Sequence, residues 1–158
     1  MREMEVVCHV EVYPWKVFVD VASSAMGTRT GIVIITPEGI RLEHSFRLDF
    51  KASNNEAEYE ALLTGLKAVR DMGAREVEVY SDSWLVVNQV QGSFEARDSR
   101  MMEYLWVVRQ VMNQFLKAKV IQMAKGQNRH ANSLAILVSS LTEEVPRLIK
   151  VELVAELV

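Results

Sequence analysis

The segment from Ser53 to Met72 constrains the fold of this chain most strongly. Ser53 is followed three residues later by Glu56, the signature of a capping box at a helix start, and Gly73 offers a left-handed stop. A helical projection gives this segment two faces. The polar face contains Glu56, Glu60, Thr64, Lys67 and Asp71, and the face expected to be buried contains Ala61, Leu62, Gly65, Val69 and Met72. We therefore expect one helix that packs against a core.

Glu58 interrupts this pattern because it falls in the middle of the apolar face. A buried carboxylate without a partner is strongly unfavourable, so it requires a cation, a hydrogen-bond network or a metal ion. A simpler interpretation places Glu58 half-exposed in the first turn, where its charge complements the positive end of the helix dipole. The choice depends on whether other carboxylates lie beside it.

Two further acidic residues end predicted strands. Residues 15–20 are rich in β-branched and aromatic side chains and end at Asp20, and the alternating residues 76–82 end at Asp82. A strand reached through a helix is most simply parallel, and such sheets bind ligands beyond the carboxyl ends of their strands. We therefore expect Asp20 and Asp82 at one edge of the sheet.

The remaining elements complete an α/β sandwich with a mixed sheet. A hairpin is expected from residues 31–36 and 40–48, joined by a turn at 37–39. Further along the chain we expect helices at 84–90, 101–115 and 128–141 and a strand at 120–123. Asp82 or Ser83 would cap the first of these helices, so capping is an alternative role for Asp82.

Length and composition predict one domain with a single core. The chain has 158 residues, a net charge of −3, one cysteine and three histidines, which offers neither a disulfide framework nor a zinc site. We assign residues 14–141 to the domain, 1–13 to a linker or lead-in strand, and 142–158 to a linker, tail or exposed strand-former. No apolar run is long enough to span a membrane, so we expect an intracellular, cytoplasmic protein.

Two strand-end aspartates and a glutamate on the intervening helix suggest an acidic cluster. Like charges gathered at one edge repel one another unless cations neutralise them. Mg²⁺ prefers oxygen ligands, and a pair of such ions about 4 Å apart stabilises the attacking and leaving oxygens of a phosphodiester displacement. The cluster of Asp20, Glu58 and Asp82 therefore predicts a metal-dependent phosphoryl-transfer site.

Four motifs resemble those of ribonuclease H domains in order and spacing. They are Val17-Phe18-Val19-Asp20, the run from Ser53 to Leu62, Val79-Tyr80-Ser81-Asp82-Ser83, and the run from Gln127 to Ala135. The chain is most similar to the ribonuclease H domains of plant gypsy-type LTR retrotransposon polyproteins, from about Trp15 to Leu141. The resemblance implies a ribonuclease H-like fold, with a five-stranded mixed sheet flanked by helices.

The resemblance also implies a metal-dependent endonuclease that hydrolyses RNA in an RNA·DNA hybrid during reverse transcription. Carried over by motif, Asp20, Glu58 and Asp82 are metal ligands for two Mg²⁺ ions, for which Mn²⁺ can substitute. Asn54 and Asn55 match the pair that lies near the hybrid, where side-chain amides reach 2′-hydroxyls and minor-groove edges. Ser83 and Trp84 are also expected beside the substrate.

This sequence departs from the family pattern at several positions. The fourth acidic ligand falls at Asn132, which offers an oxygen but no charge. Val21 stands where the family usually has glycine, and Trp84 stands at an often polar position. His130 is a candidate auxiliary residue for product release, with a surface histidine as the alternative.

These departures leave two functions open. One is a hybrid-cleaving enzyme weakened by Asn132; the other is a catalytically degenerate module that binds hybrid or neighbouring polyprotein domains without cleaving. An exonuclease or integrase sharing the fold is disfavoured by the Asn54-Asn55 helix start and the final helix. In either case the expected partners are the hybrid and the neighbouring reverse transcriptase and integrase domains. We expect the domain to be a monomer in isolation and to act naturally in a retroelement particle.

Overall fold

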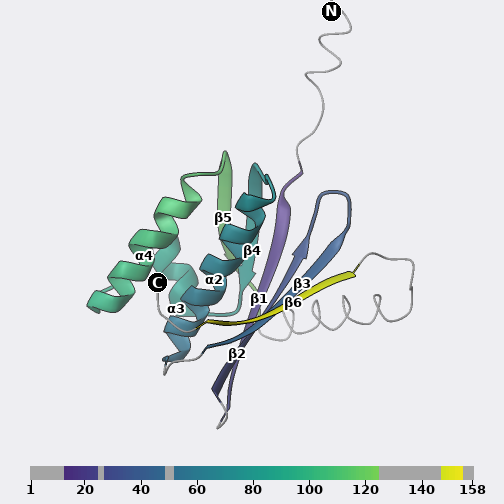
Figure 1. The fold of residues 1–158 in the computed structure, drawn as a ribbon. Helices are drawn as coiled ribbons and strands as arrows, with labels where there is room; N and C mark the ends of the chain where they lie inside the picture. Colours follow the sequence, from purple (N-terminus) through teal and green to yellow (C-terminus); the bar gives the residue numbers. More distant parts are fainter. Residues whose placement is uncertain (1–12, 25–26, 49–51, 125–146, 155–158) are drawn as a thin grey trace, which may run out of the picture.

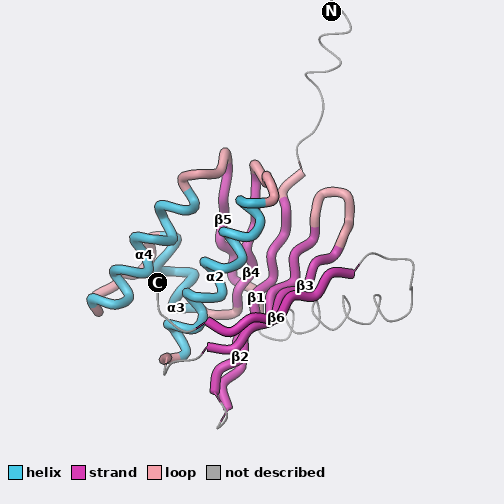
Figure 2. Tube along the Cα trace, in the orientation of Figure 1, coloured by secondary structure: helices cyan, strands magenta, loops and turns pink. Residues whose placement is uncertain are grey.

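The computed structural model describes residues 13–24, 27–48, 52–124 and 147–154. These residues form one mixed sheet with helices on one side of it (Figures 1 and 2). The strands are β1 (Trp15–Ser24), β2 (Gly27–Ile35), β3 (Arg41–Leu48), β4 (Glu76–Ser81), β5 (Lys117–Gln122) and β6 (Arg147–Val154). The described helices are α2 (Asn54–Asp71), α3 (Trp84–Gln91) and α4 (Ser99–Met112).

The strand order is β5-β4-β1-β2-β3-β6. Strands β1, β2 and β3 form an antiparallel meander, and β4 pairs in parallel with β1 after the crossover through α2. This parallel pairing confirms the expected relation between the two strands that lead to Asp20 and Asp82. Both strands therefore run toward the same edge of the sheet.

The five expected strands and the expected helices within the described residues are confirmed, and a sixth strand extends the edge. The predicted end of the first strand at Asp20 is wrong, because β1 continues to Ser24 by pairing with β2. β6 pairs in parallel with β3, with Arg41 opposite Arg147 and Leu48 opposite Val154. It belongs to the segment 142–158, which the sequence left as a linker, a tail or an exposed strand-former. The expected final helix at 128–141, together with Asn132 and His130, lies outside the described residues, as do residues 1–12.

Helix α2 forms for the local reasons visible in its sequence. The Ser53 hydroxyl accepts a hydrogen bond from the Glu56 backbone N–H at 3.2 Å, and the Glu56 carboxylate accepts one from the Ser53 N–H at 2.9 Å. This is the complete capping box predicted at the start of the helix. Helix α3 begins at Ser83, one of the two predicted caps, whose hydroxyl accepts from the Val86 N–H at 3.2 Å. Asp82 is therefore not the cap of α3.

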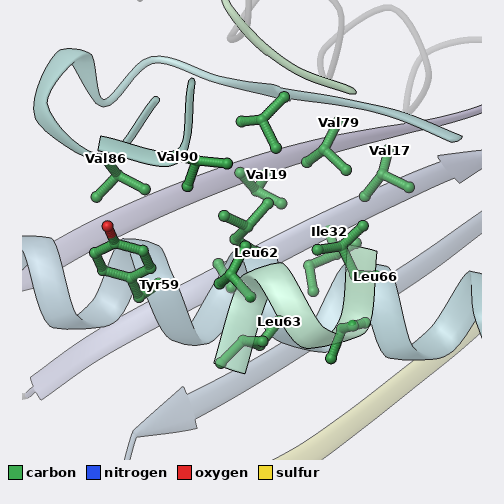
Figure 3. Close-up of a cluster of buried hydrophobic side chains, with 14 of the residues drawn as sticks. Val17, Val19, Ile32, Tyr59, Leu62, Leu63, Leu66, Val79, Val86 and Val90 are labelled. Carbon is green, nitrogen blue, oxygen red and sulfur yellow. The ribbon is translucent and has the colours of Figure 1, made fainter. Parts of the chain in front are cut away.

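The main core lies between α2 and the centre of the sheet (Figure 3). Valines of β1 and β4 and leucines of α2 fill it: Val17, Val19, Val77, Val79, Leu62, Leu63 and Leu66. Gly65 allows the helix to approach β1 closely, because a Cβ atom there would lie 2.8 Å from Val17 Cγ1. The α2 backbone is therefore fixed directly above the strand that carries Asp20.

Two details of the predicted α2 faces are wrong. Glu60, placed on the polar face, is 4% exposed, and its carboxylate accepts a hydrogen bond from the Tyr104 hydroxyl at 2.7 Å. Met72, placed on the buried face, is 43% exposed at the end of the helix. Glu60 is buried because α4 packs over this side of α2, a contact that the helical periodicity of α2 alone does not reveal.

A second buried hydrogen bond fixes α3 against α2. The Tyr59 hydroxyl donates to the Gln89 side chain at 2.6 Å, and the rings of Tyr59 and Tyr104 stack with centroids 5.4 Å apart. Both Tyr59 and Gln89 are almost fully buried. This hydrogen bond and the stacked rings join α2, α3 and α4.

Candidate active site

Glu58 is buried, as its position on the apolar face of α2 predicts. Its side chain is 8% exposed, and the Ser81 hydroxyl donates a hydrogen bond to its Oε2 at 3.2 Å. Ser81 is the last residue of β4 and immediately precedes Asp82. The alternative interpretation, a half-exposed carboxylate that only complements the helix dipole, is therefore wrong.

Three carboxylates influence one another at this edge of the sheet. Burial raises the pKa of Glu58 from 4.5 to about 8, and the negative charges of Asp82 and Asp20 add to the increase. A hydrogen bond to Asp82 also favours the protonated form of Glu58, whereas the hydrogen bond from Ser81 lowers its pKa. Asp82 thus acts on Glu58 through both contact and charge, and Asp20 through charge.

The alternation of strand residues explains why Asp20 affects Glu58 through its charge alone, whereas Asp82 also forms a hydrogen bond with it. Val17 and Val19 of β1 point toward α2, where both side chains approach Gly65. Phe18 points to the opposite face and stacks on Tyr80, with ring centroids 5.0 Å apart. Asp20 follows the same alternation as Phe18. Asp20 is therefore expected on the face of β1 opposite α2, four residues before the end of that strand.

The oxygen donors of this cluster are suited to a hard cation. Carboxylates and a neighbouring hydroxyl are ligands that Mg²⁺ and Mn²⁺ prefer, and a cation would relieve the repulsion that raises the pKa of Glu58. Gly31 is paired directly with Asp20, and a Cβ atom at Gly31 would meet no neighbour, so the space beside Asp20 is open. Among the described residues, however, no three His, Cys, Asp or Glu side chains form by themselves a group that could hold a metal ion.

The predicted substrate-binding residues lie at the starts of two helices. Asn54 and Asn55 are the first two residues of α2; Asn54 is exposed and Asn55 half-buried. Ser83 caps α3, and its backbone N–H donates to the Ser81 hydroxyl at 3.1 Å. Since Ser81 also donates to Glu58, one serine connects the buried carboxylate to the start of α3.

Trp84 forms an exposed aromatic surface beside the acidic cluster. Its side chain is 62% exposed, and it contacts the Phe94 ring edge-on with centroids 4.8 Å apart. Packing alone would bury an indole more deeply. The sequence prediction did not include Phe94, because its only signal is the three-dimensional contact with Trp84.

Ser81 is the other site residue for which no role was predicted. It was visible as part of the motif before Asp82, but its hydroxyl could be linked to Glu58 only once β4 was placed beside α2. The alternation along β4 indicates that Ser81 lies on the buried face of the strand, together with Val77 and Val79. A buried serine hydroxyl needs a hydrogen-bond partner, and here that partner is the Glu58 carboxylate.

The strand order, the helix crossover, the carboxylate within β1 and the carboxylate just after β4 together define a ribonuclease H-like domain. Comparison with known proteins agrees. A family model described as "Reverse transcriptase-like" matches residues 19–138, and the chain belongs to this family.

Ribonuclease H proteins of known structure share this fold. RNase H1 of the archaeon Halobacterium salinarum superposes with a TM-score of 0.69 and 26% identity, covering 77% of this chain and 94% of that chain. LC11-RNase H1, solved in complex with an RNA/DNA hybrid, superposes with a TM-score of 0.65 and 24% identity over 81% of this chain and 99% of that chain. At this lower identity the likeness concerns the fold.

Sequence comparison gives a related match. The ribonuclease HI of Halobacterium salinarum is 31% identical over 85 residues, which are 54% of this chain and 43% of that protein. The match thus spans less than half the length of this curated relative. None of the helices in the described part of the chain is long and apolar enough to cross a membrane.

Proposed function

We propose that this chain is a metal-dependent endonuclease that hydrolyses the RNA strand of RNA·DNA hybrids. The observation that carries the proposal is the burial of Glu58 against β4, with its pKa raised to about 8 by burial and by the charges of Asp82 and Asp20. A buried carboxylate whose pKa is strongly raised by neighbouring acids is typical of functional sites. Family membership and the relatives named as ribonuclease H support the reaction class.

In this proposal Asp20, Glu58 and Asp82 would hold Mg²⁺ or Mn²⁺. When bound, such ions activate a water molecule and stabilise the charge on the leaving oxygen of a phosphodiester. Ser81 orients the Glu58 carboxylate through its hydrogen bond to Oε2. Asn132, the fourth candidate ligand by motif, would contribute a neutral oxygen.

The helix starts would bind the hybrid. The exposed Asn54 and the half-buried Asn55 offer amide groups to the minor groove and to 2′-hydroxyls, the features that distinguish RNA from DNA. The Trp84 and Phe94 rings offer an exposed apolar surface next to the cluster, on which a sugar or base can pack. Ser83 holds the start of α3 in place as its cap.

A direct assay tests this function. Purified protein is incubated with an end-labelled RNA·DNA hybrid and Mg²⁺ or Mn²⁺, with Asp82→Asn as the matched variant. We expect cleavage of the RNA strand by the wild-type protein and loss of cleavage in Asp82→Asn, while the circular dichroism spectrum stays unchanged. Full cleavage by Asp82→Asn would remove Asp82 from the mechanism.

A second candidate function is a degenerate module that binds the hybrid without cleaving it. It is favoured by the absence, among described residues, of a complete three-residue metal group, and by the neutral Asn132. Under this candidate the wild-type protein binds hybrid but yields no products at any concentration. Restored cleavage in Asn132→Asp would then identify the lost ligand.

We also propose the biological setting from the sequence resemblance. The motifs favour a domain of a plant gypsy-type retrotransposon polyprotein, acting in a cytoplasmic particle beside reverse transcriptase and integrase domains. Membership of the "Reverse transcriptase-like" family supports this setting. Expression of the chain joined to its natural flanking sequence, followed by cleavage assays on longer hybrids, tests whether such neighbours increase activity.

A further inference from the structure

A chain of hydroxyl groups leads from the β1–β2 hairpin to the start of α2. Ser23 and Thr28 are directly opposed in the antiparallel pair, and their hydroxyl oxygens are 3.4 Å apart. The Ser23 hydroxyl donates a hydrogen bond to the side-chain oxygen of Asn54 at 3.0 Å. The hairpin therefore contacts the residue that the proposed function places against the hybrid.

The direction of this chain follows from counting hydrogens. A serine hydroxyl has one hydrogen to donate, and that of Ser23 is directed to Asn54. In the contact between the two hydroxyls, Thr28 must therefore be the donor and Ser23 the acceptor. Thr28 is 8% exposed and β-branched, so its side chain has little freedom to turn away.

This arrangement fixes which part of the Asn54 amide is available to a ligand. An asparagine side chain has one acceptor oxygen and two N–H donors, and an isolated exposed amide can turn to present either. Here the oxygen is occupied by Ser23, so the NH₂ group remains for a bound molecule. Asn54 then favours a ligand that presents a hydrogen-bond acceptor, such as the 2′-hydroxyl oxygen that only RNA carries.

We propose that Ser23 is a positioning residue that orients the Asn54 amide as a hydrogen-bond donor, and that this contributes to the selection of an RNA-containing duplex. The inference rests on the proposed function for its ligand. Ser23 itself need not touch the nucleic acid, since it acts through Asn54. Its hydroxyl, rather than its size, carries the effect.

Binding measurements on the full chain test this role. Affinities for a fluorescent RNA·DNA hybrid and for a DNA duplex of the same sequence are compared by anisotropy, in EDTA so that the hybrid stays intact. We expect Ser23→Ala to lower hybrid affinity by about three- to tenfold, the range for one lost hydrogen bond, and to leave DNA-duplex affinity nearly unchanged. Ser23→Thr retains the hydroxyl and is expected to retain the preference.

A double-mutant cycle separates positioning from a general structural effect. In an Asn54→Ala background, Ser23→Ala is expected to cause no further loss, because the amide that it orients is gone. Equal losses with and without Asn54 would overturn the inference, as would an unchanged hybrid preference in Ser23→Ala or a lost preference in Ser23→Thr.

A measurement without nucleic acid distinguishes failure of this inference from failure of the proposed function. The side-chain NH₂ resonances of Asn54 in the ¹⁵N–¹H spectrum are expected to shift in Ser23→Ala and to remain near their original positions in Ser23→Thr. No shift in Ser23→Ala overturns the inference alone. A wild-type protein that neither cleaves the hybrid nor prefers it over DNA overturns the proposed function, and the selective role of Ser23 with it.

Discussion

Replacing Glu58 by glutamine should stabilise the metal-free protein at neutral pH. Glutamine has nearly the same shape and keeps an oxygen that can accept the hydrogen bond from Ser81, but it carries no charge. The variant therefore removes the free-energy cost of protonating Glu58, or of burying its charge beside Asp82 and Asp20, without opening a cavity. The effect should depend on pH in a direction that the raised pKa determines.

The direction of the pH dependence follows from the pKa of Glu58 in the folded and unfolded states. The Glu58 pKa is raised from 4.5 to about 8, so between these values the folded protein holds a proton that the unfolded chain has released. Stability must then fall as pH rises through this window. The stability that the wild-type protein loses through Glu58 is at most about 3 kcal/mol at pH 7 and less than about 1 kcal/mol near pH 5.

Urea unfolding followed by circular dichroism, in EDTA and over about pH 5 to pH 8, measures this difference. The free energy of unfolding of Glu58→Gln should exceed that of the wild type by an amount that grows with pH, to at most about 3 kcal/mol at pH 7 and about 4 kcal/mol at pH 8. Asp71→Asn is the matched control, because it removes one carboxylate from the same helix at a side chain that is 70% exposed. The control should change stability by less than about 0.5 kcal/mol.

Adding Mg²⁺ extends the same experiment to the proposed metal site. A cation that binds only the folded state adds about 2.7 kcal/mol at a concentration one hundred times its dissociation constant. The wild type should gain stability from Mg²⁺, most at the alkaline end, whereas Glu58→Gln should gain less. A wild-type stability that does not decrease between pH 5 and pH 8 in EDTA, or that decreases equally in Glu58→Gln, would refute the reasoning about Glu58.

Two further variants test the packing that holds the site in place. Tyr104→Phe removes the hydroxyl that donates to the buried Glu60 carboxylate. We expect the variant to lower the free energy of unfolding in urea by about 1–3 kcal/mol, because the carboxylate loses this donor. A loss below the error of the measurement would contradict a stabilising role for the bond. Gly65→Ala places a Cβ atom 2.8 Å from Val17 Cγ1, and the stiff valine cannot yield cheaply. We expect a net loss of about 1–2 kcal/mol despite the better helix propensity of alanine, with Lys67→Ala, farther along the same helix, as the control; a gain in stability would show that the contact relaxes freely.

The parts of the fold that local chemistry determines could be predicted from sequence. The capping box at Ser53 involves residues three positions apart, and the helix begins where it predicts. The cap of α3 at Ser83 was one of two candidates for the same reason. The parallel pairing of the strands that carry Asp20 and lead to Asp82 was predictable because a crossover through a helix leaves few other arrangements. The end of β1 was not predictable in the same way, since the strand continues past Asp20 to Ser24 by pairing with β2.

Contacts between distant segments account for what the sequence did not reveal. Glu60 is buried by Tyr104, 44 residues away, and no property of α2 alone distinguishes it from an exposed glutamate. The pairing of β6 with β3 joins residues more than a hundred positions apart, between a strand and a segment that the sequence left open. The orientation of Asn54 by Ser23 depends similarly on where the β1–β2 hairpin ends relative to α2.

The charge that destabilises this edge of the sheet is also what would make it useful. Glu58 is held against Asp82 by a packed helix, so its charge cannot be relieved by moving the side chain into water, and the carboxylate takes up a proton below about pH 8 instead. A cation that binds there would offset the stability that the protein loses by gathering these carboxylates. The loss of stability in the metal-free protein and the affinity for the ion therefore have the same origin. A variant that stabilises the protein by removing this charge should therefore lose metal binding and cleavage together. Such a trade-off between stability and activity separates a functional carboxylate from one that merely tolerates burial.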